Sequence, residues 1–103
     1  MYLDSAVVIY LVEGVEPYYT RLQTMLDPSD YYYASHLTRL ECRVLPLRKG
    51  DTQLLADYDA FFSDQIHDVV ELNARVMDQA AEIRASHRFG IADSIQLAAA
   101  IVS

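Results

Sequence analysis

The sequence predicts an α/β fold with a short parallel sheet. Short apolar or aromatic segments alternate with longer segments in which apolar residues recur at helical spacing. Alternating strands and helices are typical of a parallel sheet, because a helix usually forms the crossover between two parallel strands. The chain has 103 residues, 52% of them hydrophobic, which suffices for one modest core, so we expect a single ordered domain over residues 1–103.

The N-terminal stretch, residues 2–12, reads YLDSAVVIYLV. We expect a short strand that ends near Asp4 and a helix that begins at Ser5, because Asp and Ser are good helix-capping residues. The β-branched residues of this stretch would also suit a longer strand, and periodicity does not decide between the two. Gly14 should end the helix, and a second helix is expected over Pro17–Leu26, with proline in its first turn.

In the middle of the chain, Tyr31–Tyr33 is a candidate aromatic strand. The segment Ser35–Leu45 has apolar residues at helical spacing, and we expect Pro46 to end that helix. Gly50-Asp51-Thr52 then forms a turn and cap before an amphipathic helix. The apolar face of that helix consists of Leu54, Leu55, Tyr58, Phe61 and Phe62.

The C-terminal third of the chain is expected to contain one strand and two helices. Residues Ile66–Leu72 form a short apolar segment that suits a strand. A helix should follow from Asn73 and end around His87–Gly90, where glycine permits a left-handed cap. The last helix is expected over Asp93–Val102.

Composition excludes several classes of function. A single cysteine, Cys42, gives neither an internal disulfide nor a zinc site, and a cytoplasmic location is expected. The longest apolar run, Ala6–Val12, is too short to span a membrane, and there is no export signal. No glycine-rich phosphate loop is present. The net charge of −7 argues against a protein that coats nucleic acid, but it suits an enzyme whose carboxylates hold divalent cations.

Three acidic residues could carry such chemistry, although each has a simpler local explanation. Asp4 lies where the first strand should end, the edge at which parallel sheets bind ligands, but a capping role explains it equally well. Glu41 should point away from Arg39 and Arg43 on its helix, yet a solvated glutamate there is ordinary. Asp93 lies among small apolar residues, which favours an interior cleft, and the helix dipole also favours an anion there.

Taken together, the segments around these acids resemble a known family. The stretches YLDSAVVIYLVEG, SHLTRLECRVLPLR and FGIADSIQLAAAI are similar, in order and interval, to the signature stretches of PIN domains, especially VapC-type ribonuclease toxins of type II toxin–antitoxin systems. The resemblance covers essentially the whole chain. It implies a three-layer α/β/α fold, with Asp4, Glu41 and Asp93 gathered at the carboxyl edge of the sheet.

The resemblance also implies a function. In such proteins the acidic residues bind Mg2+ or Mn2+, which activates water for hydrolysis of RNA phosphodiester bonds. Oxygen ligands suit these hard ions. The implied partners are an RNA substrate and a VapB-type antitoxin, whose basic tail would complement the negative chain, and a homodimer is expected.

The sequence departs from the family pattern at its C-terminal end. PIN domains usually continue into further strands with a Thr/Ser-x-Asp stretch whose acid completes the site, and this sequence ends at Ser103 first. We therefore expect the C-terminal edge strands to be missing. A second hypothesis follows, in which the chain is a catalytically impaired PIN-like module for binding or dimerisation. A phosphoesterase acting on a small substrate is a third and weaker hypothesis, because three acids define metal chemistry better than they define a polymer.

Three further residues are candidates for substrate binding. Ser5 could help hold substrate or a metal-bound water, although its capping position already explains it. Arg84 and Arg88 could contact RNA phosphates, but solvent-facing arginines without a ligand are more common. The tyrosine clusters could stack on bases, while packing is the simpler account.

Overall fold

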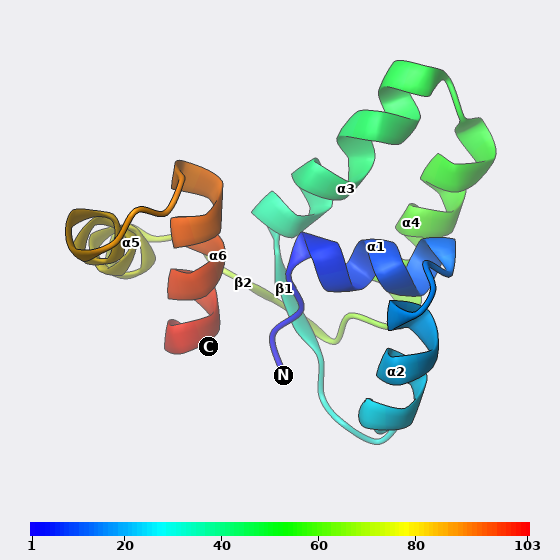
Figure 1. The fold of residues 1–103 in the computed structure, drawn as a ribbon, viewed down its shortest axis with the longest axis horizontal. Coiled ribbons are helices and arrows are strands. Elements are labelled where there is room, and N and C mark those ends of the chain that lie inside the picture. Colours follow the sequence, from blue (N-terminus) through cyan, green and yellow to red (C-terminus); the bar gives the residue numbers. More distant parts are fainter.

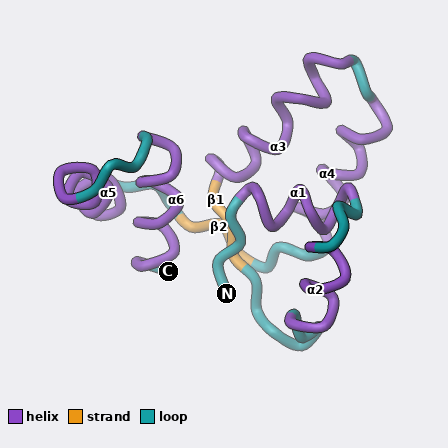
Figure 2. The backbone as a smooth tube through the Cα atoms, in the orientation of Figure 1, coloured by secondary structure: helices purple, strands orange, loops and turns teal.

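The computed structural model describes residues 1–103 and contains six helices and two short strands (Figures 1 and 2). In chain order the elements are α1 (Ser5–Glu13), α2 (Tyr18–Met25), β1 (Tyr33–Ser35), α3 (His36–Lys49), α4 (Thr52–Asp64), β2 (Asp68–Val70), α5 (Ala74–Ser86) and α6 (Ile91–Val102). The α/β class that the alternating pattern predicted is confirmed. No helix in the structure combines the length and the apolar character needed to cross a membrane.

The sheet consists of β1 and β2, which pair in parallel with Ala34 opposite Val69. The expected first strand is reduced to a bridge between Tyr2 and Tyr33, in which the Leu3 N–H donates to the Tyr33 carbonyl at 2.8 Å. The carbonyl of the preceding residue, Tyr32, accepts a hydrogen bond from the backbone N–H of His67, just before β2, at 2.9 Å. Because consecutive residues of a strand point their backbone groups to opposite sides, β1 lies between the N-terminal segment and β2.

Helices cover both faces of this small sheet. In Figure 1, α1 to α4 lie on one side of the strands, and α5 and α6 lie on the other. The core is divided accordingly into two clusters of buried residues. The first consists of Leu3, Val8, Tyr32, Ala34, Cys42, Tyr58 and Ile66. The second consists of Val76, Ala80, Ile83, Ala98 and Ala99, where α5 packs against α6. The expected three-layer α/β/α arrangement is therefore confirmed.

The capping signals placed the start of the first helix correctly. Asp4 is extended and accepts a hydrogen bond from the Val7 N–H through Oδ1 at 3.0 Å, so it caps α1. Gly14, with φ of 64°, ends that helix in the left-handed conformation that glycine adopts without steric cost. α1 thus runs from just after Asp4 to just before Gly14, as the sequence predicted.

The prediction that Pro46 ends its helix was wrong. α3 continues to Lys49, and the Pro46 ring is fully buried inside it. The Asp51 N–H donates to the Pro46 carbonyl at 2.9 Å, and the Gly50 N–H donates to the Leu47 carbonyl at 3.3 Å. These two bonds form a Schellman motif with Gly50 at φ of 65°, so the glycine and not the proline ends the helix.

Other boundaries also differ from the prediction. The helix α5 ends at Ser86 without a left-handed glycine, because Gly90 has a φ of −69° and caps the start of α6 instead. The last helix begins at Ile91, with Gly90 at its N-cap, so Asp93 is the third helical residue and not the first. The strands are also shifted or shortened: β1 starts at Tyr33, where the aromatic run was expected to end, and only Asp68–Val70 of the expected Ile66–Leu72 is paired. Strand bounds depend on where a partner strand supplies hydrogen bonds, which local composition does not encode.

Candidate active site

A cavity between the start of α1 and the helix α6 brings two of the predicted acids together. Asp4, directly before α1, and Asp93, in the first turn of α6, both line this cavity of about 340 Å³. Both are exposed at the surface. The other lining residues are Tyr2, Ser5, Ala6, Val7, Gln96, Leu97 and Ala100. The fold therefore places carboxylates from opposite ends of the chain at one opening.

The third predicted acid, Glu41, does not line this cavity but is tied to residues that do. Ser5 Oγ donates to Glu41 Oε1 at 3.2 Å, and Gln96 Nε2 donates to the same oxygen at 2.7 Å. Ser5 belongs to α1, which Asp4 caps, and Gln96 belongs to α6, which contains Asp93, so the partly buried Glu41 of α3 is linked to both helices. In Figure 1, the N-terminal ends of α1 and α3 are the ends that lie nearer α6.

A buried polar network lies behind Glu41. The Tyr2 hydroxyl donates to Gln96 Oε1 and also lies 2.9 Å from Ser35 Oγ and 3.3 Å from Thr38 Oγ1. Ser35, Thr38 and Gln96 are only 2%, 0% and 7% exposed. Every buried side-chain nitrogen and oxygen atom of the structure has a hydrogen-bond partner. A fully satisfied network of this kind fixes the orientation of its members.

The sequence prediction missed the neutral members of this network, namely Tyr2, Ser35, Thr38 and Gln96. The sequence did contain one signal for Gln96. It is the only residue with an amide side chain in the segment of small and apolar residues that follows Asp93. A polar side chain on an otherwise apolar helix face must find a partner in the interior. Its partners, however, lie in distant parts of the sequence.

The acidic surroundings act on the neighbouring ionisable groups. Burial raises the pKa of the Tyr2 hydroxyl, and the charges of Asp4 and Glu41 raise it further, while hydrogen bonds with Ser35 and Thr38 oppose the shift. Tyr2 is therefore protonated at neutral pH and acts as a donor. Burial, with Glu41 as the next cause, also raises the pKa of Cys42 to about 12, so this thiol is no nucleophile.

The donor atoms at this site suit a hard divalent cation. Asp4 and Glu41 each use one oxygen, Oδ1 and Oε1, to accept hydrogen bonds, and the second oxygen of each accepts none. Asp93 accepts no side-chain hydrogen bond, so its carboxylate is also free to bind an ion. Oxygen-only donors match Mg2+ or Mn2+ and not zinc.

The three carboxylates do not yet form a complete set of metal ligands. No three acidic, His or Cys side chains of the structure are grouped closely enough to hold a metal ion. Asp4 and Asp93 are exposed, however, so rotation about their side-chain bonds meets little packing resistance. The donor chemistry therefore fits a divalent cation, and closing the set requires side-chain movement at the cavity.

The remaining predicted site residues divide into two groups. Ser5 lines the same cavity as Asp4 and Asp93 and donates a hydrogen bond to Glu41. Arg84 lies in the last turn of α5 and Arg88 lies between α5 and α6. Both arginines are exposed, and neither lines the cavity.

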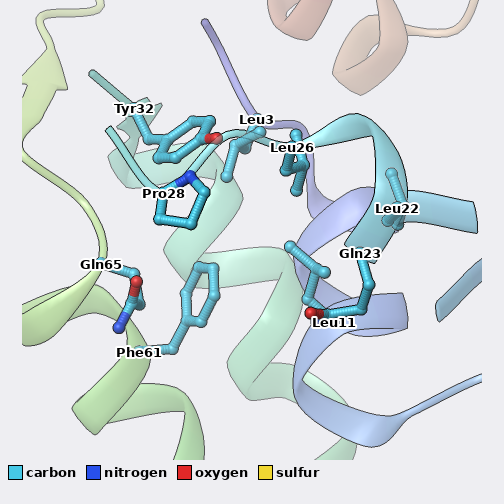
Figure 3. Close-up of a pocket in the computed structure, with 9 residues that line it drawn as sticks. All are labelled: Leu3, Leu11, Leu22, Gln23, Leu26, Pro28, Tyr32, Phe61 and Gln65. Atoms are coloured by element: carbon cyan, nitrogen blue, oxygen red, sulfur yellow. The ribbon is translucent and has the colours of Figure 1, made fainter. Parts of the chain in front are cut away.

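A second and larger cavity, of about 410 Å³, has a different character (Figure 3). Its lining is mostly apolar and comes from α1, α2, α4 and the segments beside them. In Figure 3, Leu11 of α1 and Phe61 of α4 lie on opposite sides of the opening. No carboxylate, histidine or cysteine lines it, so it offers no group for hydrolysis. The cavity that holds Asp4 and Asp93 is thus the better candidate for chemistry.

Comparison with known proteins identifies the family. The PIN domain family matches residues 1–103, which is the whole of the chain. The chain belongs to the PIN domain family. PIN domains are generally nucleases and generally use divalent metal ions, in agreement with the oxygen donors described above. No curated protein and no solved structure matches the chain. The family resemblance predicted from the three signature segments is confirmed at the level of the PIN domain.

Proposed function

We propose that this PIN domain is an RNA endonuclease that depends on Mg2+ or Mn2+ and acts as the toxin of a VapC-type toxin–antitoxin pair. The observation that supports it best is the cavity lined by Asp4 and Asp93, with Glu41 linked to it through Ser5 and Gln96. These are the three acids that the family resemblance assigns to the nuclease site.

In this proposal the chain supplies ligands and orientation. Asp4, Glu41 and Asp93 would hold the cation through the oxygens that accept no hydrogen bonds. A divalent ion held by these carboxylates would supply activation of a water molecule and would offset charge on a phosphate group. Ser5 keeps the Glu41 carboxylate beside α1. Leu97 and Ala100 form an apolar wall of the cavity.

The proposed partners follow from charge and exposed apolar surface. A basic segment of a VapB-type antitoxin would be attracted to a chain of net charge −7 and could cover the acidic cavity. Leu97 and Ile101 of α6 are 41% and 58% exposed, and we propose that this face contributes to a homodimer.

One observation favours a second candidate function. As the side chains stand, the three acids do not form a group of three metal ligands. A PIN domain whose site cannot close around a cation would act as a binding or dimerisation module without turnover. This alternative predicts antitoxin binding in the absence of cleavage.

The decisive experiment is cleavage of a mixed RNA pool in Mg2+ or Mn2+. The parent should cleave, and EDTA should abolish cleavage. Asp93→Asn should lower the cleavage rate at least about 100-fold, because even substitution of a residue that is hydrogen-bonded to a metal ligand typically lowers metal affinity or activity about 10–100-fold. Asp78→Asn is the matched control, because Asp78 is exposed on α5 outside the cavity. If neither the parent nor Asp93→Asn cleaves while both bind a candidate antitoxin, the nuclease proposal fails and the binding module stands.

A further inference from the structure

We propose that Gln96 is a positioning residue that orients Glu41 for cation binding, and that Tyr2 in turn fixes the Gln96 amide. This inference rests on the proposed function, because it assigns Gln96 a role in the metal site. Gln96 is 7% exposed and contacts Glu41 on one side and Tyr2 and Thr38 on the other. Its side chain therefore connects the buried hydroxyls to the carboxylate.

The orientation of the amide follows from the chemistry of its neighbours. An ionised carboxylate can only accept hydrogen bonds, so the Gln96 amide must turn its NH2 group toward Glu41, at the observed 2.7 Å. Its Oε1 then needs donors, which the Tyr2 hydroxyl and Thr38 Oγ1 provide. The reversed amide would bring two acceptor oxygens together at Glu41. The hydroxyls and the carboxylate thus select the same orientation.

This arrangement holds Glu41 by one oxygen and leaves the other one free. Gln96 Nε2 and Ser5 Oγ approach Oε1 from α6 and α1, whereas Oε2 accepts no hydrogen bond in the structure. Two donors from two helices restrict rotation of the carboxylate. Hydrogen-bond partners that orient a metal ligand typically contribute 10–100-fold to metal affinity. We expect a contribution of this size from Gln96.

A double-mutant cycle separates a positioning role from a merely structural one. Isothermal titration with Mn2+ is performed on the parent, Gln96→Met, Glu41→Gln and the double variant. Methionine keeps the length of the side chain but neither donates to Glu41 nor accepts from Tyr2. Gln53→Met is the matched control, because Gln53 is exposed on α4 and its side chain donates a hydrogen bond to Asp57, away from the cavity. Circular dichroism establishes that each variant is folded.

In the parent background, Gln96→Met should weaken Mn2+ binding about 10–100-fold. In the Glu41→Gln background the same change should have less than about a threefold effect, because the ligand through which Gln96 acts is already lost. Gln53→Met should bind like the parent. A structural role would lower the melting temperature and leave the Mn2+ affinity of the folded protein unchanged, and that result would overturn the proposal. Equal losses in both backgrounds would also overturn it.

Tyr2→Phe tests the same link more gently if Gln96→Met does not fold. It removes only the hydroxyl that donates to Gln96, and a loss of about two- to tenfold in Mn2+ affinity is expected from one hydrogen bond. Unchanged affinity in Tyr2→Phe, measured against a parent that binds Mn2+, would then overturn the inference alone. A parent that neither binds Mn2+ nor cleaves RNA would overturn the proposed function, and the inference with it.

Discussion

The substitution Asp4→Asn separates two roles of one residue, the capping of α1 and the proposed binding of a cation. The capping bond runs from the Val7 N–H to Asp4 Oδ1 at 3.0 Å, and asparagine caps helices as well as aspartate does. The folded protein without metal should therefore change little. The loss of a charge at the helix N-terminus costs about 0.3–1 kcal/mol, and reduced repulsion from Asp93 on the same cavity opposes that cost.

Metal binding should respond much more strongly than the cap. An ion that binds only the folded state at 100 times its Kd stabilises that state by about 2.7 kcal/mol. For a domain of this size, 1 kcal/mol corresponds to about 4–8 °C in Tm, so the parent should gain roughly 10–20 °C. If the neutral ligand weakens binding about 100-fold, the same Mn2+ concentration stabilises Asp4→Asn by only about 0.4 kcal/mol, or roughly 2–3 °C.

The assay is thermal unfolding followed by circular dichroism during a titration with Mn2+, with EDTA to restore the starting point. Asp78→Asn removes an exposed acid outside the cavity and should keep the full shift of the parent. Equal shifts in the parent and in Asp4→Asn would refute the reasoning, because the ion would then stabilise the fold without Asp4. So would the absence of any shift in the parent at saturating Mn2+.

Two further predictions concern the core. Burial, followed by the charge of Glu41, raises the pKa of Cys42 from 9.0 to about 12. The thiol therefore ionises first in the unfolded chain, and this lowers the free energy of unfolding between pH 9 and pH 12 by at most about 1.4 kcal/mol per pH unit. Below pH 9 the thiol has no effect on the pH dependence of stability. Urea unfolding should show a shallower alkaline loss in Cys42→Ala than in the parent, and equal slopes would contradict the assignment. Ala98→Leu should cost about 1–3 kcal/mol in urea unfolding, because Ala98 is 0% exposed between α5 and α6. Ala81→Leu, on the exposed face of α5, is its control, and equal unfolding midpoints would be inconsistent with a tightly packed contact.

Helix boundaries were predictable where one local interaction decides them. The Asp4 cap and Gly14 place α1, because the capping oxygen and the left-handed glycine both act within a few residues. The prediction that Pro46 ends α3 was wrong because it also relied on a local effect alone. Its lost N–H is a local effect, whereas burial of its ring depends on the tertiary fold, and the Gly50 turn satisfies the carbonyls that follow. Local signals therefore predict a boundary unless burial offsets their cost.

The three candidate acids were predicted from the family resemblance, whereas the neutral side chains that are hydrogen-bonded to Glu41 or lie behind it were not. Local chemistry left Asp4 open between a cap and a ligand, and the structure shows the capping bond while placing Asp4 on the cavity with Asp93. The bond from Tyr2 to Gln96 joins residues 94 positions apart, and the bond from Thr38 to Gln96 joins residues 58 positions apart. No periodicity links such positions, so only the folded chain reveals that neutral side chains hold Glu41.

The charge distribution constrains how an acidic PIN domain would meet RNA. Arg39 and Arg43 both pair with Asp59, so their charge is already partly neutralised. Arg84 and Arg88 lie outside the cavity, and the net charge of −7 disfavours approach of a phosphate backbone. Under the proposed function, the bound cation must therefore supply much of the attraction for the phosphate as well as the chemistry. Loss of cleavage in Asp93→Asn would then combine weaker substrate binding with slower hydrolysis, since one charge cluster serves both.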